Sequence, residues 1–307
     1  MAPEPSVEPT VGASGAVAFD YSTAFTRTLG WITQAEQARL RAARVAIAGL
    51  GGVGGSHLLT LARLGVGSFN LAEFDRFELH NFNRQAGAFM HTVGQPKIDV
   101  LTGMARAINP ELDLRLFADG VSLGNLDRFL DGVDVYVDGI DYFAFDIRRA
   151  VFAACRERGI PAVTAAPLGM GAALLVFMPG GITFDDYFQL AGQTPAEQAL
   201  RFLIGLAPAL LHGSYLADPS RVRFGDQAGP STPMACELCA GVAATEVLKL
   251  LLGRGRVRAA PHGMHFDAFR GRLARTWRPG GNRNPLQRLL LLLVRRRLSH
   301  DSSVEGT

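Results

Sequence analysis

The chain has 307 residues and a formal net charge of only +3, and 48% of its residues are hydrophobic while 19% are charged. Such a composition supplies a sizeable buried core and excludes a wholly disordered chain. The length suits two domains or one large α/β domain with extensions. The cysteines are too few for a disulfide framework, and they are Cys155, Cys236 and Cys239.

Residues 1–20 predict a disordered or loosely attached leader. The leader lacks the basic region and the long apolar run of a secretory signal peptide. No stretch of the chain reaches the length needed to span a bilayer, so we expect a cytoplasmic protein, either free or peripheral to a membrane. Positive charge gathers between residues 270 and 297, which favours an acidic partner such as RNA or an anionic membrane surface. A solvated chain end explains the same charge.

Strand and helix signals alternate from residue 33 to residue 177. The first helix is predicted from Thr33 followed by Glu36, which has the spacing of a capping box. In chain order the predicted elements are a helix at 33–41, a strand at 44–50, a helix at 56–64, a strand at 68–75, a helix at 97–108, a strand at 112–117, a helix at 123–130, a strand at 133–137, a helix at 145–158 and strands at 161–164 and 172–177. This alternation predicts an α/β fold with a doubly wound, mostly parallel, Rossmann-like sheet and helices on both faces.

The pattern becomes more helical after residue 184. We interpret residues 184–230 as an insertion or lid within a domain that spans residues 21–280. The remaining predictions are a helix at 241–252, a C-terminal hairpin with strands at 265–269 and 273–277, and a tail at 281–307 with an apolar helix at 285–298. Arginines flank this last helix, so it can bury against the domain, dimerise or lie in a membrane interface. Burial is the simplest of the three.

A glycine-rich turn joins the first predicted strand to the next helix. It reads G-x-G-x-x-G from Gly49 to Gly54 and includes Gly52. Gly49 permits a tight turn, Gly51 lets the backbone approach a phosphate, and Gly54 allows close packing of helix on strand. The N-terminus of the helix adds positive potential. The turn therefore predicts a nucleotide site, and a turn without a ligand is the alternative.

Two acids, Glu73 and Asp75, stand at the end of the second strand. An acid about 20 residues beyond the glycines accepts hydrogen bonds from ribose hydroxyls. Glu73 disfavours a 2′-phosphate, because two negative charges would repel each other. Asp75 shares the ribose role in this interpretation, and capping of the next turn is the alternative for either acid.

Two cations follow the acids and indicate a triphosphate. Arg84 lies in the run Asn81-Phe82-Asn83-Arg84-Gln85, and Lys97 starts a predicted helix. The β- and γ-phosphates extend beyond the glycine turn and need neutralising charge, which a dinucleotide does not need there. Asp141, just past the end of a strand, is the expected Mg²⁺ ligand, with Asp138 behind it. Surface positions for the cations and helix capping by Asp141 are the alternatives.

As a set, these residues resemble the ThiF/MoeB/HesA-type adenylyltransferases, the bacterial relatives of ubiquitin-activating enzymes. The family pattern is a Gly-rich loop, an acid after the second strand, N-x-x-R-Q, G-x-x-K and D-x-x-D, and it stands here at 49–54, 73, 81–85, 94–97 and 138–141. The similarity covers roughly residues 44–177 and resumes at 234–252. The nucleotide-binding set that it implies is Gly49, Gly51, Gly52, Gly54, Glu73, Asp75, Asn81, Arg84, Gln85 and Lys97.

The resemblance implies a reaction in which Mg-ATP lies across the turn and a carboxylate attacks the α-phosphorus, releasing pyrophosphate. The carboxylate belongs to a ubiquitin-like or sulfur-carrier protein, a peptide or a small acid. Members of the family usually act as dimers, in which an upstream arginine of the neighbouring subunit reaches the phosphates, and Arg27 is the expected counterpart. The implied catalytic residues are Arg27, Arg84, Lys97 and Asp141, the last as the Mg²⁺ ligand.

The chain departs from the family pattern in three ways. The structural zinc site of the family uses two C-x-x-C pairs, and only Cys236 and Cys239 are present, so we expect no zinc. The catalytic cysteine that some relatives carry in the crossover loop is missing from 184–230, so covalent capture of the acyl group is not expected unless Cys236 or Cys239 takes that part. The insertion is also more helical and apolar than a crossover loop, and we expect it to shape the acceptor site.

Three other functions remain open. Zinc-free relatives with N-x-N-R-Q include the enzyme that cyclises threonylcarbamoyladenosine in tRNA, and residues 81–85 fit that form. An NAD-dependent oxidoreductase explains the glycines and Glu73 but leaves Arg84, Lys97 and Asp141 without a purpose. A non-catalytic nucleotide-binding subunit is disfavoured by the complete set of phosphate and metal residues.

Overall fold

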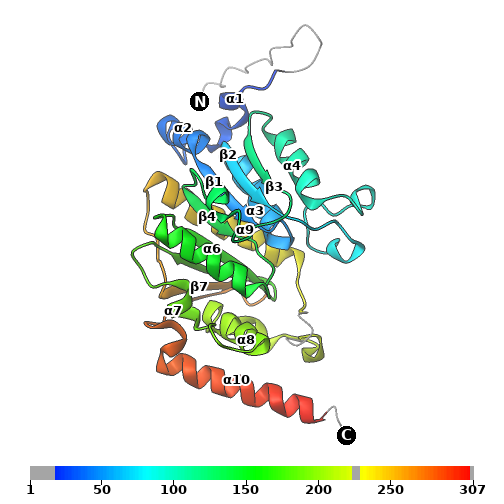
Figure 1. Ribbon diagram of the computed structural model, residues 1–307, viewed down its shortest axis with the longest axis vertical. Helices are drawn as coiled ribbons and strands as arrows, with labels where there is room; N and C mark the ends of the chain where they lie inside the picture. The colour runs from blue at the N-terminus through cyan, green and yellow to red at the C-terminus, as the bar shows by residue number, and fades with distance from the viewer. Residues whose placement is uncertain (1–17, 223–228, 305–307) are drawn as a thin grey trace.

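A computed structural model describes residues 18–222 and 229–304, with side chains up to residue 296. One sheet of eight strands, in the order β3-β2-β1-β4-β5-β6-β7-β8, runs through the molecule (Figure 1). The predicted leader falls mainly on residues 1–17, which lie outside the described residues. Asp20 caps the short helix α1 (Tyr21–Ala24) by accepting a hydrogen bond from the Thr23 N–H.

Five parallel strands form the half of the sheet that precedes the insertion. They are β1 (Arg44–Ala48), β2 (Ser68–Ala72), β3 (Asp113–Phe117), β4 (Val135–Asp138) and β5 (Ala162–Leu168). The chain moves outward from β1 to β3 and then returns to pair β4 with β1. The strand order therefore reverses between β1 and β4, and ligands of such sheets bind at the carboxyl ends of the strands beside that reversal.

Helices cover both faces of the parallel strands because β1 is apolar on both sides. Val45 and Ile47 belong to one core, and Ala46 and Ala48 belong to the other. The first core is closed by α3 (Gly52–Leu64), α4 (Lys97–Ile108) and α9 (Pro233–Leu252). The second is closed by α5 (Leu126–Phe129), α6 (Phe145–Glu157), α7 (Phe184–Phe188) and α8 (Pro195–Leu206). The doubly wound α/β class that the sequence predicts is confirmed.

The last three strands are antiparallel. They are β6 (Gly171–Phe177), β7 (His262–Asp267) and β8 (Arg272–Trp277). A two-residue connection between β5 and β6 leaves no room for a crossover, so the chain turns back on itself. The predicted terminal hairpin is present as β7 and β8. β5 is longer than the predicted 161–164 because its antiparallel pairing with β6 continues to Leu168.

Two helices differ from the sequence prediction for local reasons. α5 is a single turn rather than residues 123–130, because the Asn125 side chain accepts from the Ser122 N–H and donates to the Gly120 carbonyl, which holds that stretch in a turn. α9 starts eight residues before the predicted 241, because Pro233 occupies its first turn, where a missing N–H costs nothing.

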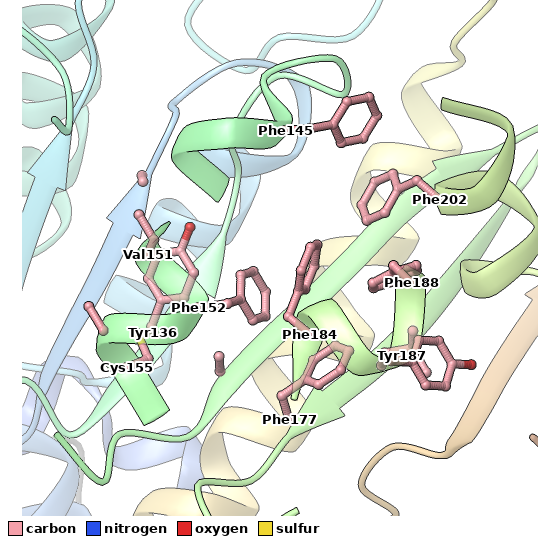
Figure 2. Packing of buried hydrophobic residues seen from close by; sticks show 14 of the residues in the cluster. Tyr136, Phe145, Val151, Phe152, Cys155, Phe177, Phe184, Tyr187, Phe188 and Phe202 are labelled. Atoms are coloured by element: carbon pink, nitrogen blue, oxygen red, sulfur yellow. The ribbon is translucent and has the colours of Figure 1, made fainter. Parts of the chain in front are cut away.

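Residues 184–222 of the insertion pack on the same face of the sheet as α6. Figure 2 shows Phe184, Phe188 and Phe202 stacked against Phe152 and Phe177 in one aromatic cluster, and all of them are buried. Such ring pairs stabilise beyond their area burial by about 0.5–1.5 kcal/mol each. Residues 223–228 of the predicted insertion lie outside the described residues.

Helix α10 (Pro285–Val304) lies at the opposite end of the molecule from α1 (Figure 1). Leu291 packs on Leu200 and Ile204 of α8, and Gln287 donates to the Ile204 carbonyl at 3.0 Å. The helix is therefore buried against the domain along one side, and the opposite side exposes Leu286, Leu289, Leu292 and Leu293. Among residues 18–222 and 229–304, no helix is long and apolar enough to cross a membrane.

Candidate nucleotide site

The glycine turn is packed against the carboxyl end of β4. Gly49 has φ +81°, and a Cβ there would overlap the Gly139 carbonyl, while a Cβ on Gly54 would overlap the Gly49 carbonyl oxygen. These two glycines are therefore needed for backbone packing. Around Gly51 the space is open, since the nearest atom to a Cβ would be the Gln85 amide nitrogen at 3.8 Å. The turn thus leaves room for a ligand at Gly51 and holds the ends of β1 and β4 together.

Glu73, directly after β2, holds the turn in place. Its side chain is buried, and Oε2 accepts a hydrogen bond from the Leu50 N–H at 2.8 Å. Oε1 accepts from the Phe74 N–H at 2.8 Å and from the Asp75 N–H at 2.9 Å. An ionised carboxylate has about four acceptor sites, so capacity for a ribose hydroxyl remains. The sequence indicated the ribose role but contained no signal for the contact with Leu50.

Lys97 and Asp75 form an ion pair beside the turn. Lys97 is the first residue of α4 and only 5% exposed, and its Nζ lies 3.1 Å from Asp75 Oδ2. The Lys97 N–H also donates to the Asp75 carbonyl at 2.9 Å. Asp75 is therefore the partner that stabilises this buried ammonium, and its expected ribose contact stays a prediction.

Arg84 lies over the first turn of α3. A Cβ on Gly52 would stand 3.4 Å from Arg84 Cγ, so the stem of the arginine packs on that glycine. Its Nη1 donates to the His80 carbonyl at 3.1 Å and to Asn83 Oδ1 at 2.9 Å. Asn83 in turn donates to the Ser231 carbonyl at 3.0 Å, just before α9. The guanidinium is therefore oriented by neighbours and keeps further N–H groups for a phosphate.

Asn81 and Gln85 of the same motif are buried. Asn81 Oδ1 accepts from the Glu78 N–H at 2.9 Å, which fixes the 3₁₀ turn that precedes Arg84. Gln85 packs beside Gly51, and its buried Oε1 has no partner among the described residues. A buried acceptor of this kind costs about 1–3 kcal/mol unless something donates to it, so Gln85 is available for a ligand or a water molecule.

Of the two acids after β4, only Asp141 is free to meet a cation. Asp138 is buried and accepts from Arg148 Nε at 2.9 Å and from Thr164 Oγ1 at 2.9 Å. Asp141 is exposed, and its Oδ1 accepts from the Phe143 N–H at 3.0 Å, while its Oδ2 has no hydrogen-bond partner among the described residues. Arg148 was not identified from the sequence, because an arginine within a predicted helix has no distinguishing local signal.

Arg27 lies apart from this group of residues. It is exposed on a 3₁₀ helix at Thr26–Thr28, before β1. Within residues 18–222 and 229–304, no hydrogen bond or ion pair joins Arg27 to the turn or to the cations. Its expected role in a neighbouring subunit stays a prediction.

The three cysteines are buried thiols. Cys236 and Cys239 lie in the first turns of α9, and a Cβ on Gly52 would stand 3.1 Å from Cys236 Sγ. Burial raises the pKa of both thiols above the ordinary value and also raises the pKa of Cys155. Within the part of the chain that the structure describes, no group of three or more His, Cys, Asp or Glu residues is placed to hold a metal ion. That zinc is not bound stays a prediction.

We expect the double variant Cys236→Ala/Cys239→Ala to keep nucleotide-dependent activity within about threefold of the wild type. The reason is that a thiol whose pKa is raised by burial carries little thiolate at neutral pH and is a poor nucleophile. Initial rates of the reaction proposed below, together with thiol labelling of the folded protein, provide the measurement. Rapid labelling of Cys236, or activity lost without loss of folding, would give the cysteines a chemical role.

Comparison with known proteins agrees with this geometry. Residues 25–289 match the ThiF family. A tRNA threonylcarbamoyladenosine dehydratase of Bacillus subtilis is 35% identical over 135 residues, which are 44% of this chain and 51% of that protein. The crystal structure of PaaA superposes with a TM-score of 0.63 at 18% identity, covering 90% of this chain and 77% of that one. The crystal structure of E. coli MccB with ATP superposes with a TM-score of 0.58 at 19% sequence identity, covering 78% of this chain and 65% of that one.

These matches differ in what they show. The chain spans about half the length of the curated relatives that it matches first. The similarity to the solved structures shows the fold alone, because the sequence identities are 18% and 19% and a shared fold does not imply a shared function. The family match covers most of the chain, including the glycine turn, both cations and both acids after β4. By this match, and in agreement with the motifs and the sheet that carries them, the chain belongs to the ThiF family.

Proposed function

We propose that the chain binds Mg-ATP across the glycine turn and adenylates a carboxylate. One observation carries the proposal: Arg84 packs on Gly52, at the N-terminus of α3, while the turn itself contacts Gly139 between Asp138 and Asp141. A magnesium triphosphate needs a cation and an acid. Arg84 and the strand end that carries Asp141 therefore both contact the same glycine turn. Lys97, held by Asp75 next to Glu73, supplies the second cation.

In the proposed reaction, a carboxylate oxygen attacks the α-phosphorus and the bond to the pyrophosphate oxygen breaks, giving an acyl adenylate and pyrophosphate. Arg84 and Lys97 neutralise the charge that moves onto the leaving pyrophosphate. The N–H groups at the start of α3 face the phosphates. No protein nucleophile is needed, which agrees with three buried, protonated thiols. Positioning and charge neutralisation supply the rate enhancement.

Asp141 fits the role of magnesium ligand better than Asp138. Its second carboxylate oxygen has no hydrogen-bond partner among the described residues, whereas Asp138 is already neutralised by Arg148. Mg²⁺ is held by one or two carboxylates together with phosphate oxygens, which is what one free aspartate beside the turn provides. A magnesium ion held by Asp141 would neutralise part of the charge on the phosphates.

The carboxylate remains the open part of the proposal. The relative from Bacillus subtilis is named for a modified nucleoside of tRNA, and Asn81 to Gln85 fit the motif of that group, so a threonylcarbamoyladenosine cyclase is the second candidate. A ubiquitin-like carrier protein and a peptide are the other substrate classes. A nicotinamide reaction is disfavoured because it would leave Arg84 and Lys97 without phosphates to bind.

ATP–pyrophosphate exchange tests the function directly. Labelled pyrophosphate is expected to enter ATP only when a suitable carboxylate is present, and the panel should include glycine-ended carrier proteins, peptides and tRNA bearing threonylcarbamoyladenosine. Hydride transfer to or from a nicotinamide cofactor would overturn the proposal. Binding of ATP without exchange for any carboxylate would favour a non-catalytic partner subunit.

We also propose that two copies of the chain associate through the segment between β2 and α4. This segment, which also carries Arg84, exposes several large apolar side chains, and they are Phe74, Leu79, Phe82, Phe89, Met90 and Val93. Exposed apolar patches of this kind mark interaction surfaces. A partner on this surface would stand next to the phosphates, where Arg27 of the other copy is expected to act.

Met90→Glu is expected to convert a dimer into a monomer, because Met90 is 75% exposed and a carboxylate at the centre of an apolar interface would be buried without a partner. Light scattering coupled to size-exclusion chromatography measures the mass. Leu273→Glu on β8, also exposed but at the far edge of the sheet, serves as the control. A wild-type monomer, or a Met90→Glu dimer, would contradict this interface.

A further inference from the structure

The loop after β4 is attached to the insertion helix α8. The Tyr142 hydroxyl donates to the Ala199 carbonyl of α8 at 2.8 Å, and the Tyr142 ring lies edge-on to Phe202 with ring centroids 5.3 Å apart. Asp141 and Tyr142 are adjacent in sequence. The carboxylate proposed for magnesium is therefore one residue from an anchor on α8.

Arg148 of α6 holds the same loop by its backbone. Its Nη2 donates to the carbonyls of Ile140 and Asp141, and its Nη1 donates to the Tyr142 carbonyl at 3.1 Å. Three consecutive carbonyls of the loop thus converge on one guanidinium. The position of that guanidinium determines the path of the loop, since each N–H of the planar group points in a fixed direction.

Phe202 of α8 covers this guanidinium. The Arg148 Cζ lies 4.9 Å from the centre of the Phe202 ring, within cation–π range, and both side chains are buried. Figure 2 shows the Phe202 ring turned towards Phe145, with its centroid 5.5 Å from that ring. α8 therefore covers the buried guanidinium from which these partly buried hydrogen bonds are donated.

We propose that α8 is a positioning element for the Asp141 loop, acting through Tyr142 and Phe202, so that the insertion takes part in the adenylation step itself. The sequence led us to expect only an acceptor-shaping role for residues 184–230. This inference rests on the proposed function in assigning magnesium to Asp141. Its structural part, the attachment of the loop to α8, is independent of that assignment.

Tyr142→Phe is the most selective test, because it removes one hydroxyl and keeps the ring. Tyr187→Phe is the matched control, since the Tyr187 hydroxyl also donates to a carbonyl of α8, that of Gly205 at 3.0 Å, but comes from α7. We expect Tyr142→Phe to raise the Mg²⁺ concentration for half-maximal exchange by about three- to tenfold, the effect of one buried hydrogen bond. The rate at saturating Mg²⁺ should stay within about twofold. Tyr187→Phe should change neither value, although both variants unfold at similar temperatures.

Two measurements do not depend on turnover. Electron paramagnetic resonance of Mn²⁺ with a non-hydrolysable ATP analogue should show the same weakening for Tyr142→Phe. Hydrogen exchange of residues 139–144 in the free protein should become faster in Tyr142→Phe than in Tyr187→Phe. Phe202→Leu keeps an apolar side chain and should also weaken Mn²⁺ binding and speed the hydrogen exchange of residues 139–144. Phe188→Leu is its control.

Equal Mg²⁺ dependence and equal hydrogen exchange in Tyr142→Phe and Tyr187→Phe would overturn the inference. Faster hydrogen exchange of residues 139–144 without any change in Mn²⁺ affinity would also overturn it. In that case α8 would hold the loop without affecting the binding of the ion. A wild-type protein that binds Mn²⁺ with the analogue yet shows no pyrophosphate exchange would reject the proposed reaction, and the Mn²⁺ and hydrogen-exchange comparisons would still decide the role of α8.

Discussion

Replacing Arg84 or Lys97 with alanine is expected to lower kcat/KM for ATP–pyrophosphate exchange by about 10²–10³-fold in each case, the loss typical of one preorganised donor at a developing charge. Both side chains are oriented before ATP arrives, Arg84 by Asn83 and the His80 carbonyl, and Lys97 by Asp75. That preorganisation is why a large loss is expected rather than the small effect of a mobile surface cation.

Lys97→Ala should lower kcat/KM by more than the loss of one cation alone would, because it leaves the Asp75 carboxylate unneutralised beside the phosphates. The double variant Lys97→Ala/Asp75→Ala should therefore recover part of the activity, a coupling that a double-mutant cycle measures. Arg76→Ala is the control: Arg76 lies in the same segment, is exposed and, among the described residues, donates to the Gly94 carbonyl alone, at 2.7 Å. If ATP–pyrophosphate exchange persists in both Arg84→Ala and Lys97→Ala, the assignment of these two side chains to phosphate binding is wrong.

Gly54→Ala is expected to destabilise the protein by about 3 kcal/mol or more, and little folded, ATP-binding protein should remain at 37 °C. Two effects oppose each other at this position. Alanine favours the helix over glycine by about 0.5–1 kcal/mol, but its Cβ would overlap the Gly49 carbonyl oxygen. The overlap is with backbone, which cannot rotate away, so the ends of β1 and β4 must separate and the steric effect prevails.

The control for Gly54 is Gly103→Ala in α4, where a Cβ would meet nothing within 4 Å. Here only helix propensity acts, and we expect the midpoint of urea unfolding to rise slightly, consistent with about 0.5–1 kcal/mol of stabilisation. Equilibrium unfolding in urea compares the two variants. Similar stability of Gly54→Ala and wild type would show that the turn can relax and that Gly54 serves some purpose other than packing.

Much of the fold was predictable because its signals are local. The apolar run that becomes β1, the glycines that follow it and the capping residues Thr33 and Glu36 act within a few neighbouring positions. The family pattern likewise places Arg84, Lys97 and Asp141 at positions that the fold brings to the carboxyl edge of the strands. α5 was predicted too long because a side chain, that of Asn125, competed for the backbone before the helix.

The sequence favours Asp141 over Asp138 as the Mg²⁺ ligand from its place past the strand end, but it does not predict the contacts that separate the two acids. Asp138 and Asp141 are three residues apart and chemically identical in the sequence. They differ because the chain folds back so that Arg148 reaches Asp138, while Asp141 remains exposed. Similarly, the ion pair between Asp75 and Lys97 could not be predicted, because it depends on where the start of α4 lies, and the ribose role of Asp75 stays a prediction.

By itself, the sequence of this protein determined the doubly wound class, the glycine turn and the residue types that surround a triphosphate, because each follows from spacing along a strand or a helix. Tertiary structure decided which groups are available and which are already paired. It also decided that Cys236 lies under Arg84, and that α8 closes over the loop of Asp141. The physical reason is that burial and pairing depend on contacts between residues far apart in the chain, which no local pattern encodes.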